Sequence, residues 1–215
     1  MSRRVVLWRH GRTEWNATGR FQGQSDIDLD DLGREQAGAA ARHLAALKPE
    51  VVVSSDLVRA RDTAAALHAI IGGTAQADPR LRETFAGRWQ GLTVEQIQQH
   101  FADEYEAWRA GDPTLEVGGG ECRRDVAQRM VAACTQVSEA LPDDGLAVLV
   151  THGGSARLAI ASLIGLPLER FTNVGGLSNG SWSMLRASGP GTEHGWILME
   201  HNAGTLPPPV TIEEG

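Results

Sequence analysis

Apolar positions along the chain follow two patterns. Three short runs are apolar without interruption, which is typical of strands buried on both faces of a parallel sheet, and they are 5–8, 51–53 and 146–150. Other segments repeat apolar side chains every three or four positions, which predicts amphipathic helices over 32–47, 57–71, 125–141 and 156–164. Further strands are expected at 75–77, 181–186 and 196–201. Strands that alternate with helices predict an α/β fold, a three-layer α/β/α sandwich around a mostly parallel sheet.

Helix starts can be read from polar residues at the edges of these segments. Asp31 is expected to cap the helix over 32–47, because a side-chain oxygen there can accept a free backbone amide. Thr93 and Gln96 have the spacing of a capping box, which predicts a helix that continues towards Ala110.

The length of the chain favours one domain. With 215 residues, of which 41% are hydrophobic, the chain can bury one sizeable core, and we expect a single domain over 1–202. The region 88–121 is expected to form a cap-like insertion over the site, although its aromatic side chains, Trp89, Phe101, Tyr105 and Trp108, also fit a local core. The tail 203–215, with three prolines and two glutamates, is expected to be disordered.

Charge and cysteine content exclude several classes of protein. A net charge of −7 argues against nucleic-acid binding. No apolar run has the length of a membrane span, and the N-terminal residues lack the apolar segment of a secretory signal. Cys122 and Cys134 have neither disulfide-framework nor zinc-ligand spacing, which favours reduced thiols in a cytoplasmic protein. Histidines 43, 68, 100, 194 and 201 have no partner pattern, and we expect structural or surface roles for them.

Two of the buried strands are followed by similar polar residues. The run 5–8 leads into Arg9-His10-Gly11, and the run 146–150 leads into Thr151-His152-Gly153. Alone, Arg-His-Gly is also what a strand that simply reaches solvent would carry. Because ligands bind at the carboxyl ends of parallel strands, the repetition favours one site in which both histidines meet an anion, beside the planar guanidinium of Arg9.

Arg59 and Glu83 are two further candidate residues of this site. Arg59 falls in the first turn of an expected helix, where a cation is unfavourable unless an anion is bound beside it. Glu83 lies in a loop and can protonate a leaving oxygen. Two guanidinium groups, two imidazoles and one carboxyl group suit phosphoryl transfer without a metal, since one imidazole can attack phosphorus while the other stabilises the charged oxygens.

Four separated motifs, in this order along the chain, resemble those of the histidine phosphatase superfamily, also called the phosphoglycerate mutase-like family. The first two are Arg9-His10-Gly11 with Thr13 and Asn16, and Ser54-Ser55 with Arg59-Ala60 and Thr63-Ala64. The other two are Glu83 with Gly87, Trp89 and Gly91, and Thr151-His152-Gly153-Gly154. The resemblance implies that His10 is phosphorylated and that Glu83 is general acid and then base. It further implies a phosphate pocket with substrate contacts, formed by Arg9, Arg59, His152, Asn16, Gln22, Gly23 and Gly153, for a small phosphate ester with no metal or cofactor. Cys122 stands where family members commonly have Ser, which affects the local helix cap and not the chemistry.

Several functions remain open within this resemblance. A phosphomonoesterase is favoured over a cofactor-dependent phosphoglycerate mutase, because 83–87 reads Glu-Thr-Phe-Ala-Gly and the mutases have Glu-Arg-His-Tyr-Gly there. A non-catalytic phosphate-binding module is disfavoured because the catalytic residues are present, and a metallophosphatase because clustered Asp and His are missing. Segments 81–84, 89–93 and 175–182 are similar to actinobacterial glucosyl-3-phosphoglycerate phosphatases, which makes glucosyl-3-phosphoglycerate the candidate substrate and a broad-specificity phosphatase the alternative. Arg12, Arg20 and Arg88 are candidates to pair with a glycerate carboxylate, and a homodimer is kept as an expectation.

Overall fold

A computed structural model describes residues 2–187 and 195–204 of the chain. Its centre is a six-stranded sheet with the strand order β3-β2-β4-β1-β5-β6, in which the strands are β1 (Arg4–Arg9), β2 (Val51–Ser54), β3 (Gln76–Ala77), β4 (Leu146–Thr151), β5 (Trp182–Ala187) and β6 (Trp196–Ala203). The first four strands in this order are parallel, and β5 and β6 are antiparallel to their neighbours. The mostly parallel sheet expected from the sequence is confirmed.

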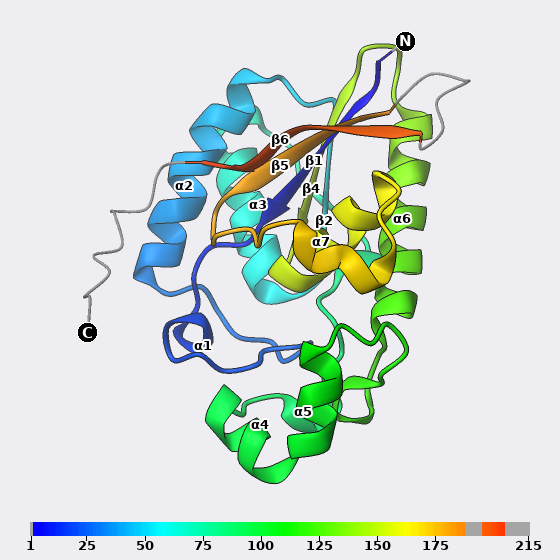
Figure 1. The fold of residues 1–215 in the computed structure, drawn as a ribbon. Helices are drawn as coiled ribbons and strands as arrows, with labels where there is room; N and C mark the ends of the chain where they lie inside the picture. Colours follow the sequence, from blue (N-terminus) through cyan, green and yellow to red (C-terminus); the bar gives the residue numbers. More distant parts are fainter. Residues whose placement is uncertain (1, 188–194, 205–215) are drawn as a thin grey trace, which may run out of the picture.

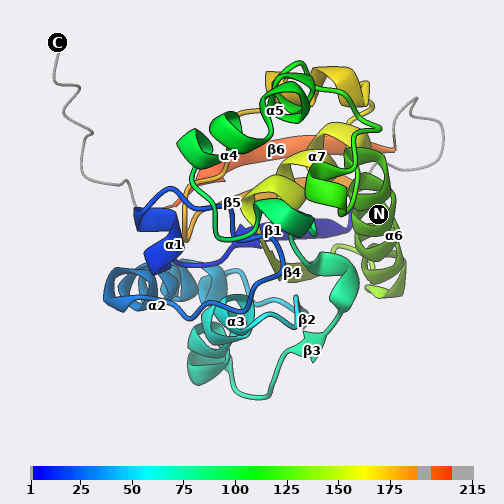
Figure 2. The ribbon, with the colours of Figure 1, turned by 90° about the horizontal axis from the view of Figure 1, so that it is seen from below.

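Helices cover both faces of the sheet. Val5 and Leu7 of β1 belong to a core cluster with side chains of α6 (Arg123–Ala140) and α7 (Gly153–Leu163). Val6 and Trp8 belong to a second cluster with α2 (Asp31–Ala46) and α3 (Val58–Ile71). Successive side chains of a strand point to opposite faces, so a run that is apolar throughout is what a sheet between two helix layers requires (Figure 2). The three-layer α/β/α sandwich is confirmed.

Three helix predictions differ from the structure, one of them being α7, which begins at Gly153 and not at 156. The carboxylate of Asp30, and not that of Asp31, accepts the amide of Gly33 at 2.7 Å, so Asp31 is the first residue of α2. The helix expected from Thr93 to Ala110 is two helices, α4 (Val94–His100) and α5 (Ala102–Arg109), because the residue between them, Phe101, has a non-helical backbone and packs against a local core. The capping box at Thr93 is confirmed, with Gln96 Oε1 accepting the Thr93 amide at 2.9 Å.

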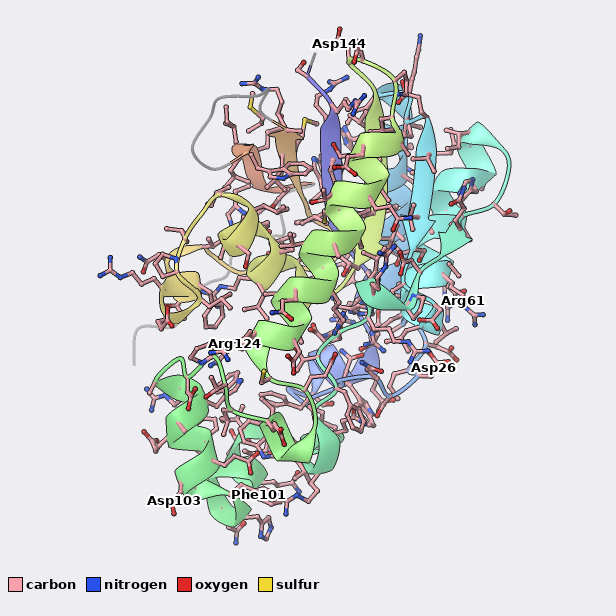
Figure 3. All side chains as sticks on the ribbon, turned by 90° about the vertical axis from the view of Figure 1, so that its right-hand side faces the viewer. Asp26, Arg61, Phe101, Asp103, Arg124 and Asp144 are labelled. Carbon is pink, nitrogen blue, oxygen red and sulfur yellow. The ribbon has the colours of Figure 1, made fainter. Side chains whose placement is uncertain are left out.

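The segment 88–121 lies at the carboxyl ends of the parallel strands (Figure 1). Its buried side chains form a third core cluster, which contains Trp89, Ile97 and Tyr105 and against which Phe101 and Trp108 pack. Figure 3 places Phe101 and Asp103 in this segment and Asp144 at the opposite end of the molecule. The aromatic residues therefore stabilise the segment itself.

The C-terminal strand reaches one residue past the boundary expected at 202. Ala203 pairs with Trp182, which keeps it in β6. The remainder of the expected tail, 205–215, lies outside the described residues, as does His194. None of the helices within 2–187 and 195–204 combines the length and the apolar character needed to cross a membrane.

Candidate active site

The two motif histidines meet because their strands are neighbours in the sheet. Arg9 of β1 is paired with Thr151 of β4, and His10 and His152 follow directly. The amide of His10 donates to the Thr151 carbonyl at 3.0 Å. The centroids of the two imidazole rings are 5.1 Å apart. Positions 142 apart in the sequence thus share one site, as expected from the strand ends.

One ring nitrogen of His10 makes a hydrogen bond, and the other has no partner among the described residues. Its Nδ1 lies 2.6 Å from the carbonyl oxygen of Gly11, so Nδ1 carries the proton and Nε2 keeps its lone pair. Burial, then the positive charges of Arg59 and Arg9, hold the pKa of His10 well below its ordinary value, and the bond to Gly11 opposes this shift. A buried, neutral imidazole with a free Nε2 has the form that a nucleophile needs.

Position 11 must be a glycine because the backbone of α2 passes close to it. A Cβ atom at position 11 would lie 2.1 Å from the carbonyl oxygen of Gly33 at the start of α2. A side chain would push β1 and α2 apart and move His10, so this glycine is needed for close approach.

Two guanidinium groups flank His10. Arg9 Nη1 donates to Leu177 O at 2.5 Å, while its buried Nε donates to no atom of the described chain. Arg59 is fully buried and donates to the carbonyls of Gly23 and Ser25 at 2.8 Å and 2.7 Å. Burial lowers the pKa of Arg59 to about 10 and also lowers that of Arg9, in both cases against the charge of Glu83. These partly desolvated cations would be stabilised by a bound anion.

His152 is held by protein groups on both sides of its ring. Arg59 Nε donates to its Nδ1 at 3.2 Å, and its Nε2 lies 2.9 Å from Ser55 Oγ. The ring is therefore neutral, with the proton on Nε2, and burial together with the charge of Arg59 holds its pKa well below the ordinary value. His152 is fully buried and supports Arg59 from behind, and it can contact a phosphate only by exchanging one of these bonds.

Glu83 reaches the amino-terminal end of α7. Its Oε2 accepts the amide of Gly154 at 2.9 Å, and its Oε1 accepts the amides of Ser155 and Thr84 at 3.0 Å and 2.8 Å. Free amides and the helix dipole make a helix start a favourable place for a carboxyl group. The carboxyl position is thus set by the backbone.

Arg129 of α6, which sequence reasoning missed, holds the loop that carries Glu83. It donates to the carbonyls of Arg80, Arg82 and Glu83 at 2.7, 2.6 and 3.0 Å. Its Nε and Nη2 each donate to the carboxylate of Glu121 at 2.9 Å. A planar fork with five donors can make all of these bonds at once.

One cavity of about 480 Å³ joins these groups to the expected substrate contacts. Arg9, His10, Arg59 and Glu83 line it, as do Asn16, Gln22, Gly23 and Gly153, whereas His152 lies behind the wall. Gln22 Oε1 is buried and accepts no hydrogen bond from the described chain. A polar group left unpaired beside a cavity is available to a ligand.

The arginines expected to contact substrate are only partly those that line the cavity. Arg20 does line it, but Arg12 pairs with Asp30 at 2.7 Å, and Arg88 is mostly exposed over the ring of Phe101. The lining instead includes three arginines that sequence reasoning missed, Arg109, Arg123 and Arg157. None of the three had a readable signal; Arg157 shares a helix face with Gly153 only because α7 begins at Gly153, before the start expected at 156.

A metal site in the described part of the chain would require a group of ligating side chains. Residues 2–187 and 195–204 contain no group of three or more His, Cys, Asp or Glu that could hold a metal ion. The positive charge around His10 comes from Arg9 and Arg59.

Comparison with known proteins identifies the family. The model of the histidine phosphatase superfamily (branch 1) matches residues 5–202. The chain belongs to the histidine phosphatase superfamily. The resemblance seen in the sequence motifs is confirmed.

Relatives of this histidine phosphatase include well-matched enzymes. A glucosyl-3-phosphoglycerate phosphatase of Mycolicibacterium vanbaalenii is 46% identical over 189 residues, which cover 85% of this chain and 84% of the relative. One of the same name from Mycobacterium tuberculosis is 43% identical over 191 residues, or 86% and 85% of the two chains. A solved mycobacterial glucosyl-3-phosphoglycerate phosphatase in complex with VO3 superposes with a TM-score of 0.85 at 42% identity, covering 94% of this chain and 100% of that one. The expected phosphatase class and phosphoglycerate mutase-like fold are confirmed.

Proposed function

We propose that this histidine phosphatase hydrolyses glucosyl-3-phosphoglycerate through a phosphohistidine at His10. One observation carries the catalytic part of the proposal, namely a neutral His10 that shares one cavity with the guanidinium groups of Arg9 and Arg59. The substrate is supported by relatives of that name at 43–46% identity over most of the chain.

In the first step, His10 Nε2 attacks phosphorus and the bond from phosphorus to the ester oxygen breaks. Arg9 and Arg59 stabilise the charge on the phosphoryl oxygens, since preorganised cations act strongly in a site from which water is excluded. Glu83, in its acid form, gives its proton to the leaving oxygen, which becomes the hydroxyl group of glucosylglycerate.

In the second step, water attacks phosphorus and the bond to His10 Nε2 breaks. The carboxylate of Glu83 takes the proton of that water, which returns Glu83 to its acid form and releases inorganic phosphate. His152 keeps Arg59 oriented through the 3.2 Å bond to its Nε. Asn16, Gln22, Gly23 and Gly153 contact the substrate, and the region 88–121 acts as a cap over the cavity.

Steady-state kinetics tests the substrate. We expect a higher kcat/KM for glucosyl-3-phosphoglycerate than for para-nitrophenyl phosphate, because only the larger ester uses binding remote from phosphorus to stabilise the transition state. Phosphoserine and 3-phosphoglycerate complete the panel, and conversion of 3-phosphoglycerate into its 2-isomer is followed in parallel. Equal or reversed kcat/KM values would leave a broad-specificity phosphatase, and net isomerisation would favour a mutase.

We also propose a cytoplasmic homodimer. Two buried free thiols, Cys122 and Cys134, support a reducing compartment. Strand β6 at the edge of the sheet supports association, because Ile197 and Met199 are 41% and 51% exposed on it. Light scattering coupled to gel filtration tests the dimer, and a mass of about 23 kDa, that of one chain, would rule it out.

A further inference from the structure

Two arginines of the cavity wall have no acidic partner among the described residues. Arg123 begins α6 and Arg157 lies in α7, and their guanidinium carbons are 4.7 Å and 5.0 Å from the centroid of one ring, that of Phe171. Within 2–187 and 195–204, no carboxylate oxygen lies within the 4.0 Å ion-pair distance of either guanidinium. Two like charges therefore stand near each other on the wall without a carboxylate at ion-pair distance in the described chain.

Two other arginines near the site are neutralised by carboxylates. Arg82 pairs with Asp56 at 2.5 Å, and Arg129 pairs with Glu121 at 2.9 Å. These side chains serve the loop that carries Glu83. Arg123 and Arg157 have no such ion pair among the described residues, a property that they share with Arg9, Arg20 and Arg59 of the same cavity.

Backbone carbonyls orient the two unpaired guanidinium groups. Each donates two hydrogen bonds of 2.6 to 3.1 Å, to the carbonyls of Trp108 and Asp112 from Arg123 and to those of Thr172 and Val174 from Arg157. Such bonds fix the positions of the guanidinium groups but do not neutralise their positive charge. Among the described residues, Arg123 Nε and Arg157 Nη1 have no acceptor.

Burial makes these charges unfavourable without an anion. It lowers the pKa of Arg123 to about 10; the charge of Asp112 opposes this shift, and the charge of Arg157 adds a smaller contribution to it. The carboxylate of Asp112 itself accepts from the amide and hydroxyl of Thr114 at 2.8 Å and 2.7 Å. Burial also lowers the pKa of Arg157. A bound carboxylate would stabilise both cations.

The position of Arg157 relates this pair to the phosphate site. Gly153 and Arg157 are four residues apart on α7, so their Cβ positions are about 6 Å apart on one helix face. The Cβ position of Gly153 is 3.2 Å from the guanidinium of Arg9. Arg157 therefore lies one helical turn beyond the phosphate pocket, within reach of a group a few bonds from phosphorus. Figure 3 labels Arg124, in the first turn of α6, next to the segment 88–121.

We propose that Arg157, with Arg123, forms a second anion subsite that binds a substrate carboxylate a few bonds from the phosphate. Arg157 Nη1 donates to the carboxylate, and Arg123 adds positive charge behind it. This inference rests on the proposed function, because it assigns the glycerate carboxylate of that substrate to named residues. It also narrows the substrate class to carboxylate-bearing phosphate esters.

Two substrates that differ in one group test the subsite. 3-Phosphoglycerate carries a carboxylate where glycerol 3-phosphate carries a hydroxymethyl group, and both leave as primary alkoxides. We expect Arg157→Met to lower kcat/KM for 3-phosphoglycerate about 10- to 100-fold more than for glycerol 3-phosphate, the usual worth of a hydrogen bond to a charged group. Arg157→Lys keeps the charge without the planar fork, and its selective loss should be smaller.

Arg109→Gln is the matched control. Arg109 lines the same cavity, but it is exposed and has Glu106 at 3.8 Å, so its loss should not discriminate between the two substrates. Thermal melting identifies a variant that fails to fold; in that case the wild-type enzyme decides, because a subsite requires it to prefer 3-phosphoglycerate over glycerol 3-phosphate.

The outcomes separate this inference from the proposed function. Equal losses on both substrates in folded Arg157→Met would overturn the subsite, even if the wild-type enzyme prefers glucosyl-3-phosphoglycerate. A selective loss in an enzyme that shows no preference for the glucosylated ester would retain the subsite and reject the proposed substrate.

Discussion

Replacing Gly154 by alanine should displace the general acid without changing its chemistry. A Cβ atom at position 154 would lie 2.7 Å from Glu83 Oε1, whereas ordinary van der Waals contact begins at 3.4 Å. The carboxyl oxygen must therefore move by about 0.7 Å, the difference between these distances. Because that oxygen ends a flexible side chain, it can move while the backbone of α7 stays in place.

The expected loss of activity follows from the role of the Glu83 carboxyl group as general acid. A positioned acid contributes about 10²–10⁴-fold, and a misplacement of about 1 Å can cost about 10²-fold. We therefore expect kcat/KM for an alkyl phosphate such as 3-phosphoglycerate to fall about 10- to 100-fold. Stability should change little, since alanine in a helix gains about 0.4–1 kcal/mol. This gain offsets much of the loss as the bonds from Ser155 N and Thr84 N to Glu83 Oε1 weaken, bonds that are worth about 0.5–1.5 kcal/mol each.

A comparison of leaving groups is the assay. The para-nitrophenolate ion departs without needing a proton from Glu83. The kcat/KM for para-nitrophenyl phosphate reports the steps up to the departure of that ion, so it should change less than about 3-fold. Glu83 also activates the water of the second step, so the variant should release a rapid burst of nitrophenol before its steady state. Gly38→Ala on α2, whose Cβ would meet nothing within 4 Å, is the control for the helix effect alone. Equal losses on alkyl and aryl phosphates, with no burst, would refute the assignment of Glu83 as the acid.

Three further predictions concern the nucleophile, the metal and the pH. His10→Ala should abolish turnover and the acid-labile phosphoenzyme in a protein whose circular dichroism is unchanged; normal turnover would remove His10 as nucleophile. Activity should survive EDTA because Arg9 and Arg59 supply the charge that a metal would bring; full loss that an added metal restores would contradict this. Because the pKa of both His10 and His152 lies below 6.5 in the folded chain, the unfolded chain binds protons that the folded chain refuses, so the free energy of unfolding should fall as pH drops below 6.5. Urea titrations at pH 7 and pH 5.5 test this, and equal stability at both would count against buried neutral imidazoles.

Much of the fold could be predicted from local sequence. Uninterrupted apolar runs identify β1, β2 and β4, because a strand between two helix layers buries both sets of its alternating side chains. Once these strands are parallel, their carboxyl ends meet, so the proximity of His10 and His152 was foreseeable. The family motifs also name residues that the fold then brings to one cavity.

Boundaries and partners required the tertiary structure. The break at Phe101 was not visible in a continuous helical pattern, since it depends on where the ring packs. Sequence alone offered Arg12, Arg20 and Arg88 with equal weight, and only packing decided that Arg12 pairs with Asp30.

The sequence by itself determined the strand and helix order and the residue types of the site, because both are recorded in local patterns. The tertiary structure alone decided which charges are neutralised. Arg129 turns to Glu121 and to the loop of Glu83, whereas Arg123 and Arg157 face the cavity over Phe171 without an acid in the described chain. The physical reason is that a charge interaction depends on distance and burial in space, and these arise only when segments far apart in sequence pack together.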